Sequence, residues 1–138
     1  MKYRYTSFFP PDNTVRWIKR PVVQIEVFGP AGKRTFEALI DSGADVSPFN
    51  IQVAELLGFD LSRAKARNFV GISGGVEAFT LEEVGIQVEG IDSSIVIPVS
   101  FVRSPSVSLL LGQEGFFDAL RIKFEKDHDT FEITPVEK

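Results

Sequence analysis

The chain has 138 residues, of which 43% are hydrophobic, and its formal net charge is −4. This hydrophobic content excludes a disordered chain, and the length is that of one ordinary domain. The sequence contains no cysteine, which excludes a disulfide framework, a thiolate zinc site and a cysteine nucleophile. It has no apolar run of the roughly 20 residues that span a membrane, and residues 1–5 lack the apolar segment of a signal peptide. We therefore expect a cytoplasmic protein without a membrane partner.

The charge is distributed unevenly along the chain. Residues 1–40 contain seven basic and three acidic side chains, whereas the remaining residues contain eight basic and sixteen acidic ones. A basic patch around Arg16, Lys19 and Arg20 either binds an acidic partner such as nucleic acid, or is a solvated face or a surface that meets the acidic part of a neighbouring subunit. Because no nucleic-acid-binding motif accompanies the patch, the sequence predicts no nucleic-acid partner.

The first 20 residues have no clear period. Phe9-Pro10-Pro11-Asp12 excludes regular structure there, because proline fixes φ and restricts the residue before it. We expect residues 1–20 to form an N-terminal arm, which packs on a partner or frays, and residues 21–138 to form a single domain.

The first part of this domain is predicted to be a β-hairpin. Hydrophobic and polar residues alternate in residues 21–28, which is the period of a strand with one buried face. Gly29-Pro30-Ala31-Gly32 is a turn sequence, and residues 34–40 form the return strand. This return strand ends directly before Asp41.

One short helix is predicted after the hairpin. Asn50 is expected to cap a helix over residues 51–57, in which the apolar residues share one face, and Gly58 ends it. Another helical turn or two is expected within residues 113–120.

The rest of the sequence has β character, so the fold class is mostly β. Residues 69–79 are predicted to be a glycine-rich connection with strand-like ends. The expected strands are residues 81–88 and 94–102, which pair with each other, the short buried strand 109–111, and residues 121–125 and 130–134, which form a last hairpin.

The sequence Asp41-Ser42-Gly43-Ala44-Asp45 directly follows an apolar strand. A carboxylate at a strand end followed by Ser and Gly lies in a tight turn, where Gly43 permits close backbone approach and Ser42 forms local hydrogen bonds. Such a triplet by itself is ordinary turn chemistry. A second apolar run that ends in glycine, Leu109-Leu110-Leu111-Gly112, follows later in the chain.

With these two motifs the chain resembles the retropepsin-like aspartic proteases over roughly residues 20–135. The resemblance implies a small closed β-barrel-like acid protease domain with one or two short helices. It also implies a homodimer that hydrolyses peptide bonds in an extended peptide or protein substrate, without a metal or another cofactor. Two aspartates share one proton in this family; one activates water and the other polarises the peptide carbonyl. The single Asp-Ser-Gly sequence therefore implies that the second aspartate comes from a second copy.

The resemblance assigns Asp41 as the catalytic aspartate. The other residues that it assigns are Ser42, Gly43 and Ala44 in the active-site loop, Asp45, Gly71, Gly74 and Gly75 in substrate binding, and Leu110, Leu111 and Gly112 in support of the loop. The three substrate-binding glycines would lie in or near the flap, the hairpin that covers the substrate, and Ser42 would brace the dimer.

The sequence departs from the viral members of this family at three points. Those members follow the second glycine with a basic residue and then Asn or Asp, whereas this chain has Gln113-Glu114. Residues 46–50 contain a proline and an early helix, and the N-terminal arm is longer. In these departures the chain resembles a cellular relative with an altered dimer mode.

Three other interpretations remain. Gly71-Ile72-Ser73-Gly74-Gly75 matches the G-x-S-x-G nucleophile elbow of serine hydrolases, and His128 follows it, but the elbow needs a helix where the sequence predicts a strand. Asp127-His128-Asp129 offers metal ligands, but adjacent side chains point in different directions, so a solvated turn is favoured and no metal is predicted. The same fold could also serve as a non-catalytic peptide-binding or dimerisation module, in which Asp41 is a structural turn residue.

Overall fold

Most of the protein is built from β-strands. The computed structural model describes residues 1–8, 18–71, 74–104 and 108–137. The strands are β1 (Lys2–Arg4), β2 (Thr6–Phe8), β3 (Ile18–Arg20), β4 (Val22–Gly29), β5 (Gly32–Ile40), β6 (Pro48–Asn50), β7 (Lys65–Gly71), β8 (Gly74–Val88), β9 (Ile95–Val102), β10 (Leu109–Leu111), β11 (Leu120–Glu125) and β12 (Thr130–Pro135). The helical segments are α1 (Ile51–Leu57), η1 (Leu61–Arg63), η2 (Gln113–Phe117) and η3 (Lys126–His128). The mostly β fold class is confirmed.

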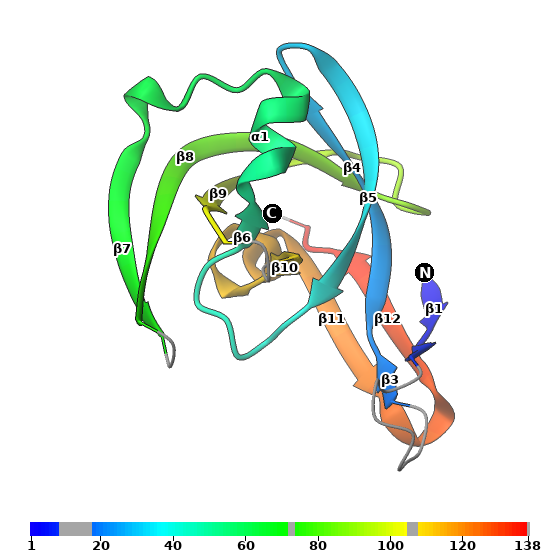
Figure 1. Cartoon of the computed structure of the whole chain (residues 1–138). Coiled ribbons are helices and arrows are strands. Elements are labelled where there is room, and N and C mark those ends of the chain that lie inside the picture. The colour runs from blue at the N-terminus through cyan, green and yellow to red at the C-terminus, as the bar shows by residue number, and fades with distance from the viewer. Residues whose placement is uncertain (9–17, 72–73, 105–107, 138) are drawn as a thin grey trace.

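The largest sheet curves into a nearly closed barrel (Figure 1). Its strand order is β10-β5-β4-β8-β9-β6, and β7 pairs with β8 outside this path. β10 runs parallel to β5 and β6 runs parallel to β9, whereas the other pairs are antiparallel. The two end strands, β10 and β6, are joined where the Gly112 N–H donates to Ser47 Oγ at 3.0 Å. The barrel therefore closes a few residues away from Asp41.

The core fills the inside of this barrel. On β4, Val23, Ile25 and Val27 are at most 3% exposed, whereas the intervening Gln24 is exposed, which is the alternation that the sequence predicts. Phe49 and Phe101, both fully buried, meet edge to face with ring centroids 6.2 Å apart. Each such apolar side chain contributes about 1.5–3 kcal/mol through its removal from water.

Helix α1 has the bounds that its local signals predict. The Asn50 side chain accepts a hydrogen bond from the Gln52 N–H at 2.9 Å, and Gly58 ends the helix in the left-handed conformation at φ 73°. The helix packs closely on the β4–β5 hairpin, since a Cβ added at Gly29 would lie 2.6 Å from Leu57 Cβ. Glycine at the hairpin end therefore lets the helix cover the barrel.

Both predicted hairpins of the barrel are present, but the first strand of the second hairpin, β8, begins earlier than predicted. β4 pairs with β5, and β8 pairs with β9, as expected. Residues 69–79, predicted to be a glycine-rich connection, are instead largely strand: β8 begins at Gly74, runs for 15 residues and pairs with β7. A register shift between Leu81 and Val84 interrupts its pairing with β9. Such an irregularity bends a strand, and so one long strand can serve both the β7–β8 hairpin and the barrel.

The two ends of the chain form a separate three-stranded sheet in the order β1-β12-β11. The predicted last hairpin corresponds to β11 and β12, and β1 lies beside β12 (Figure 1). Tyr3 stacks on Phe131 across this pair, with ring centroids 5.4 Å apart. The described part of residues 1–20 thus contains β1, β2 and β3, which are too short to show a period in the sequence. The division into an arm of residues 1–20 and a domain of residues 21–138 stays a prediction.

Two residues of the basic patch predicted near the N-terminus, Lys19 and Arg20, contact other side chains of the same chain. Lys19 Nζ lies 2.6 Å from Asp129 Oδ2, and the Arg20 guanidinium lies over the Phe8 ring, 5.9 Å from its centroid. Arg16 and the Phe9–Asp12 segment lie outside the described residues.

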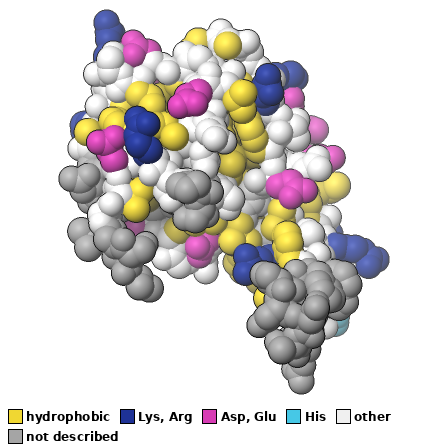
Figure 2. Space-filling model, viewed as in Figure 1, with side chains coloured by type: hydrophobic (Ala, Val, Ile, Leu, Met, Phe, Trp, Pro, Cys, Tyr) yellow, Lys and Arg dark blue, Asp and Glu magenta, His cyan; other side chains and the backbone are white. Residues whose placement is uncertain are grey.

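On the face seen in Figure 2, hydrophobic side chains reach the surface in several patches that border on charged ones. The large hydrophobic residues that are exposed include Phe8, Ile18, Leu56, Val96 and Phe124, which belong to five different elements. Within the described ranges, the helices are too short or too polar to cross a membrane.

Candidate active site

Asp41 lies directly after β5, near the place where the two end strands of the barrel sheet, β10 and β6, are joined. Strands β5 and β10 are parallel, with Leu111 aligned with Ile40, so both strands end at the same edge. The Asp41 N–H donates to the Leu111 carbonyl oxygen at 2.9 Å. The buried side chains of Ile40 and Leu111 anchor the two strand ends, and Asp41 itself is half-buried. A carboxylate thus stands where the apolar strand leaves the core.

The residues after Asp41 form a tight turn around its carboxylate. The Gly43 N–H donates to Asp41 Oδ1 at 2.9 Å, and the Ala44 N–H donates to the Asp41 carbonyl oxygen at 3.2 Å. This is a turn in which an aspartate accepts from the backbone two residues on. A Cβ at position 43 would lie 3.3 Å from Asp41 Oδ1, so any larger residue would crowd the carboxylate. Ser42, Gly43 and Asp45 are exposed and Ala44 is half-buried.

We call residues 41–47 the Asp41 loop, and residues 112–114 the support segment. The backbone N–H groups of Gln113 and Glu114 donate to the carbonyl oxygens of Ala44 and Asp45 at 2.8 and 2.9 Å. The Gly112 N–H donates to the hydroxyl of Ser47, which is fully buried. Every residue of the support segment thus holds the Asp41 loop through its backbone N–H.

Gly112 is enclosed by the Asp41 loop. A Cβ at this position would lie 2.0 Å from the Val46 carbonyl oxygen and 2.6 Å from the Ala44 carbonyl oxygen. Backbone atoms cannot withdraw as a flexible side chain can, so only glycine fits. Leu111 is fully buried below it and Leu110 is half-buried. These three residues therefore lie where the sequence places support for the loop, although their role stays a prediction.

Two side chains that sequence reasoning did not assign also join the Asp41 loop to the support segment. The Ser47 hydroxyl accepts from Gly112, and Gln113 Nε2 donates to the Ser42 carbonyl oxygen at 2.7 Å. No motif could indicate these contacts, because each joins a side chain to a backbone group at least 65 residues away. The Gln113-Glu114 departure was visible in the sequence, but its structural consequence was not.

The predicted flap glycines lie in the β7–β8 hairpin. Gly71 is aligned with Gly74, and Val70 with Gly75, at the end of the paired region. In Figure 1 this hairpin points toward the same side of the barrel as the loop that follows β5. A Cβ at Gly75 would meet nothing within 4 Å. These glycines thus lie in a hairpin, as the flap assignment requires, while their contact with substrate stays a prediction.

The competing motifs receive less structural support. Gly74 begins a strand of 15 residues, so the G-x-S-x-G sequence lacks the helix that a nucleophile elbow needs; Ser73 itself lies outside the described residues. His128 lies in η3 with its Nε2 3.4 Å from the exposed Asp127 carboxylate. Among the described residues, no three His, Cys, Asp or Glu side chains are grouped so that they could hold a metal ion.

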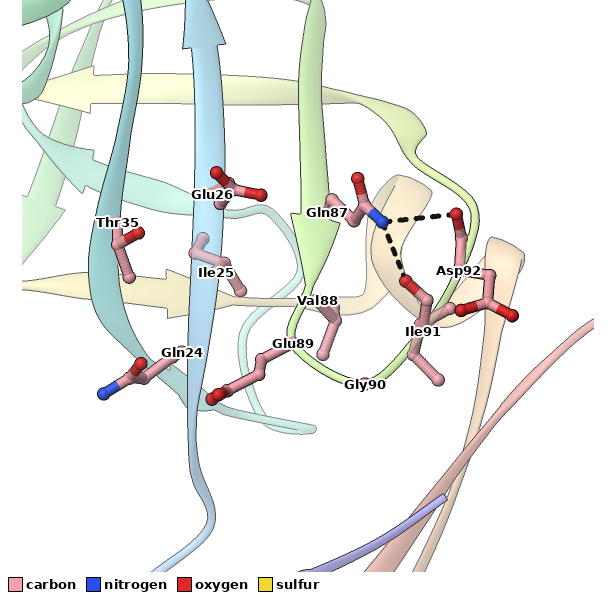
Figure 3. A pocket seen from close by; sticks show the side chains of 10 residues that line it. All are labelled: Gln24, Ile25, Glu26, Thr35, Gln87, Val88, Glu89, Gly90, Ile91 and Asp92. Atoms are coloured by element: carbon pink, nitrogen blue, oxygen red, sulfur yellow. Dashed lines mark hydrogen bonds between the residues drawn. The ribbon is translucent and has the colours of Figure 1, made fainter.

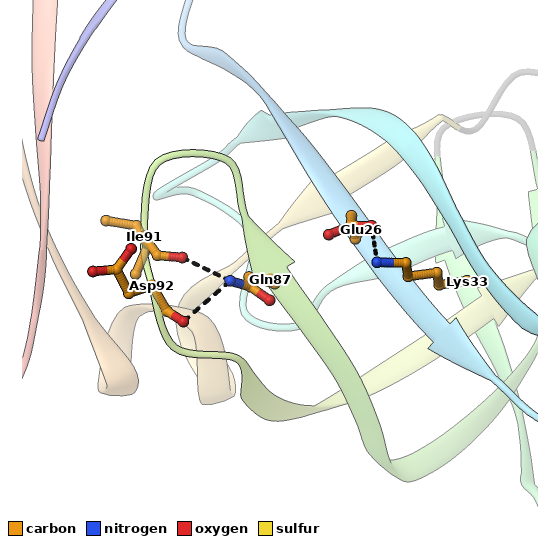
Figure 4. Close-up of polar contacts among 5 residues, drawn as sticks. All are labelled: Glu26, Lys33, Gln87, Ile91 and Asp92. Carbon is orange, nitrogen blue, oxygen red and sulfur yellow. Dashed lines mark hydrogen bonds and ion pairs between the residues drawn. The ribbon is translucent and has the colours of Figure 1, made fainter.

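A cavity of about 380 Å³ lies elsewhere on the barrel, between β4, β8 and the turn after β8 (Figure 3). The Gln87 amide holds this turn by donating to the carbonyl oxygens of Ile91 and Asp92 at 2.9 and 3.2 Å, and Lys33 pairs with Glu26 at 3.0 Å (Figure 4). The described lining residues belong to β4, β5, β8 and that turn, and not to the Asp41 loop. This cavity is therefore separate from the candidate site.

A comparison with protein families relates this geometry to known proteins. The model of a family described as aspartyl protease matches residues 23–114, more than half of the chain. The matched region contains the Asp41 loop, the β7–β8 hairpin and β10. A search of curated proteins found no match. On the family match, the chain belongs to the retropepsin-like family of aspartyl proteases.

Proposed function

We infer that the protein is an aspartic endopeptidase in which a pair of Asp41 carboxylates, one from each subunit of a homodimer, activates water. The observation that carries this proposal is the position of Asp41. Asp41 is half-buried directly after β5, and its carboxylate accepts a hydrogen bond from the Gly43 N–H. The family match supports a protease-like function.

The chemistry needs two carboxylates that share one proton. Two like charges at close range cannot both ionise, so one member is protonated and the other is charged. The charged carboxylate takes a proton from water as the water oxygen attacks the peptide carbonyl carbon, and the protonated one donates to the carbonyl oxygen. The tetrahedral intermediate then breaks its C–N bond as the leaving nitrogen takes a proton from the carboxyl group that deprotonated the water. The other carboxylate takes the proton back from a hydroxyl of the intermediate, which leaves the carboxylic acid product and restores the pair with one shared proton. Water is consumed, and neither a metal nor a cofactor takes part.

The homodimer follows from the count of such aspartates. The chain has one Asp-Ser-Gly sequence, and a symmetric dimer would bring two copies of one loop to the same axis. Ser42 would brace the two loops, and Gly43 and Ala44 would complete each of them. Leu110 and Leu111, on the strand beside β5, and Gly112, which is hydrogen-bonded to Ser47, would support the loop of each subunit.

The substrate would bind as an extended segment. An extended peptide between the β7–β8 hairpin and the Asp41 loop would form strand-like backbone hydrogen bonds, which give affinity with limited side-chain selectivity. Gly71, Gly74 and Gly75 would allow the hairpin backbone to approach the peptide. Asp45, which is exposed in the Asp41 loop, would accept hydrogen bonds from the backbone of the peptide.

The test is cleavage of a mixed peptide library from acid to neutral pH by the wild-type protein and by Asp41→Asn. We expect the variant to lose activity by at least about 10²-fold, because an amide is no general base. Asp127→Asn is the matched control, since Asp127 is exposed in η3. Activity that survives in Asp41→Asn would refute the assignment. If the wild-type protein assembles but cleaves no peptide, the non-catalytic binding or dimerisation module is the better description.

A further inference from the structure

The peptide unit between Ser42 and Gly43 contacts the candidate catalytic carboxylate on one side and a second side chain on the other. Its N–H, that of Gly43, donates to Asp41 Oδ1 at 2.9 Å. Its carbonyl oxygen, that of Ser42, accepts from Gln113 Nε2 at 2.7 Å. One rigid plane therefore lies between Gln113 and Asp41.

This arrangement couples the two side chains physically. Because the peptide unit is planar, a rotation that displaces the Ser42 carbonyl oxygen also turns the Gly43 N–H away from Asp41. A hydrogen bond to the carbonyl oxygen also polarises the amide and strengthens its N–H as a donor, as in any chain of hydrogen bonds. Gln113 thus acts on the Asp41 carboxylate without touching it.

The backbone of Gln113 is fixed where this contact needs it. The Gln113 N–H donates to the Ala44 carbonyl oxygen at 2.8 Å, and the next N–H, that of Glu114, donates to Asp45. The side chain thus starts from a backbone that is already tied to the Asp41 loop, so no further backbone freedom is lost when its amide reaches Ser42. Gln113 is also exposed, so a substitution there leaves the core intact.

We propose that Gln113 is a positioning residue, which orients the Ser42–Gly43 peptide so that the Gly43 N–H stays on the Asp41 carboxylate. The effect on catalysis rests on the proposed peptidase function, whereas the effect on the loop does not. The role belongs to the side-chain donor at position 113, whose Nε2 lies 2.7 Å from the Ser42 carbonyl oxygen.

The experiment compares Gln113→Met, which keeps the length of the side chain but removes the donor, with Gln113→Lys, which supplies another donor. Gln52→Met is the matched control, since Gln52 is exposed on α1. The full-length proteins are assayed for kcat and KM, and the solvent exchange of the Gly43 amide hydrogen is followed by NMR. We expect Gln113→Met to lower kcat about threefold to tenfold, the equivalent of one hydrogen bond, with KM nearly unchanged. Exchange at Gly43 should accelerate in the same variant.

Gln113→Lys should restore both values toward those of the wild-type protein, and Gln52→Met should change neither. The proposal is overturned if Gly43 exchanges equally fast in wild type and Gln113→Met, or if Gln113→Lys fails to recover what Gln113→Met lost. If no variant cleaves peptide, the proposed function fails, but the exchange rates still decide whether Gln113 orients the loop.

Discussion

The N–H of Asp41 donates to the carbonyl oxygen of Leu111 at 2.9 Å, although 70 positions separate the two residues in the sequence. This bond continues the parallel pairing of β5 and β10 by one step beyond Ile40. The backbone of Asp41 is therefore positioned by a strand pair of the barrel sheet and not by the Asp41 loop alone. A site on paired strands is held more rigidly than one on a loop alone.

Gly112→Ala is expected to destabilise the protein strongly. The added Cβ would lie 2.0 Å from the Val46 carbonyl oxygen, so the backbone of the Asp41 loop must move. Overpacking of this kind costs about 1–3 kcal/mol or more in the free energy of unfolding. Urea denaturation would measure it. Gly75→Ala is the control, because its Cβ would meet nothing within 4 Å; equal stability of the two variants would contradict the enclosed position of Gly112.

Ser47→Ala is expected to cost about 1–3 kcal/mol, because it leaves the buried Gly112 N–H without its acceptor. Thermal or urea unfolding would measure the loss. Ser93→Ala, a substitution at an exposed position, should change stability by no more than about 0.5 kcal/mol. If Ser47→Ala were as mild as Ser93→Ala, then the Ser47 hydroxyl would not be what joins the two ends of the barrel sheet.

Mixing of subunits should reduce activity if the site needs two copies of Asp41. When a constant amount of wild-type chain exchanges with an equal amount of Asp41→Asn, random pairing leaves about half of the wild-type chains in fully wild-type dimers. Peptidase activity should therefore fall to about half, and further with excess variant. Added Asp127→Asn chain should cause no such loss. If peptidase activity stays unchanged when the Asp41→Asn chain is added, then each copy carries a complete site.

Asp129→Asn should lower stability at neutral pH and have little effect in acid. The hydrogen bond from Lys19 is the main cause that holds the pKa of Asp129 below its ordinary value of 3.8. A carboxyl group with a lower pKa in the folded state stabilises the protein above its unfolded pKa, and this contribution is lost as the pH falls through the folded value. Asparagine also tolerates the left-handed conformation of this position, φ 57°.

Urea midpoints at pH 7, 5 and 3 would test this prediction. The difference between wild type and Asp129→Asn should be present at pH 7 and 5 and should shrink below about pH 4. Asp127→Asn serves as the control in the same turn, where the Asp127 side chain is 79% exposed. A difference that grows in acid would reverse the sign and exclude the Lys19 contact as its source.

Several elements could be predicted because their causes lie within a few residues. The cap at Asn50 and the left-handed Gly58 bound α1, and the alternation of Val23, Ile25 and Val27 identifies β4. The Asp-Ser-Gly turn after a buried strand likewise identifies Asp41 as the candidate carboxylate. Each of these signals is a local preference of the backbone or a period of burial, and both can be read from sequence.

Other features depended on the tertiary structure alone. β1 has three residues and no period, so only its pairing with β12 makes it a strand. The glycines at the start of β8 suggested a loop, yet the pairing with β7 extends the strand through them. The contacts of the Ser47 side chain with Gly112 and of the Gln113 side chain with Ser42 join side chains to backbone groups, which every residue carries regardless of its type. The sequence by itself therefore determined which residues could form the site, whereas the closure of the barrel decided which distant backbone groups would hold it.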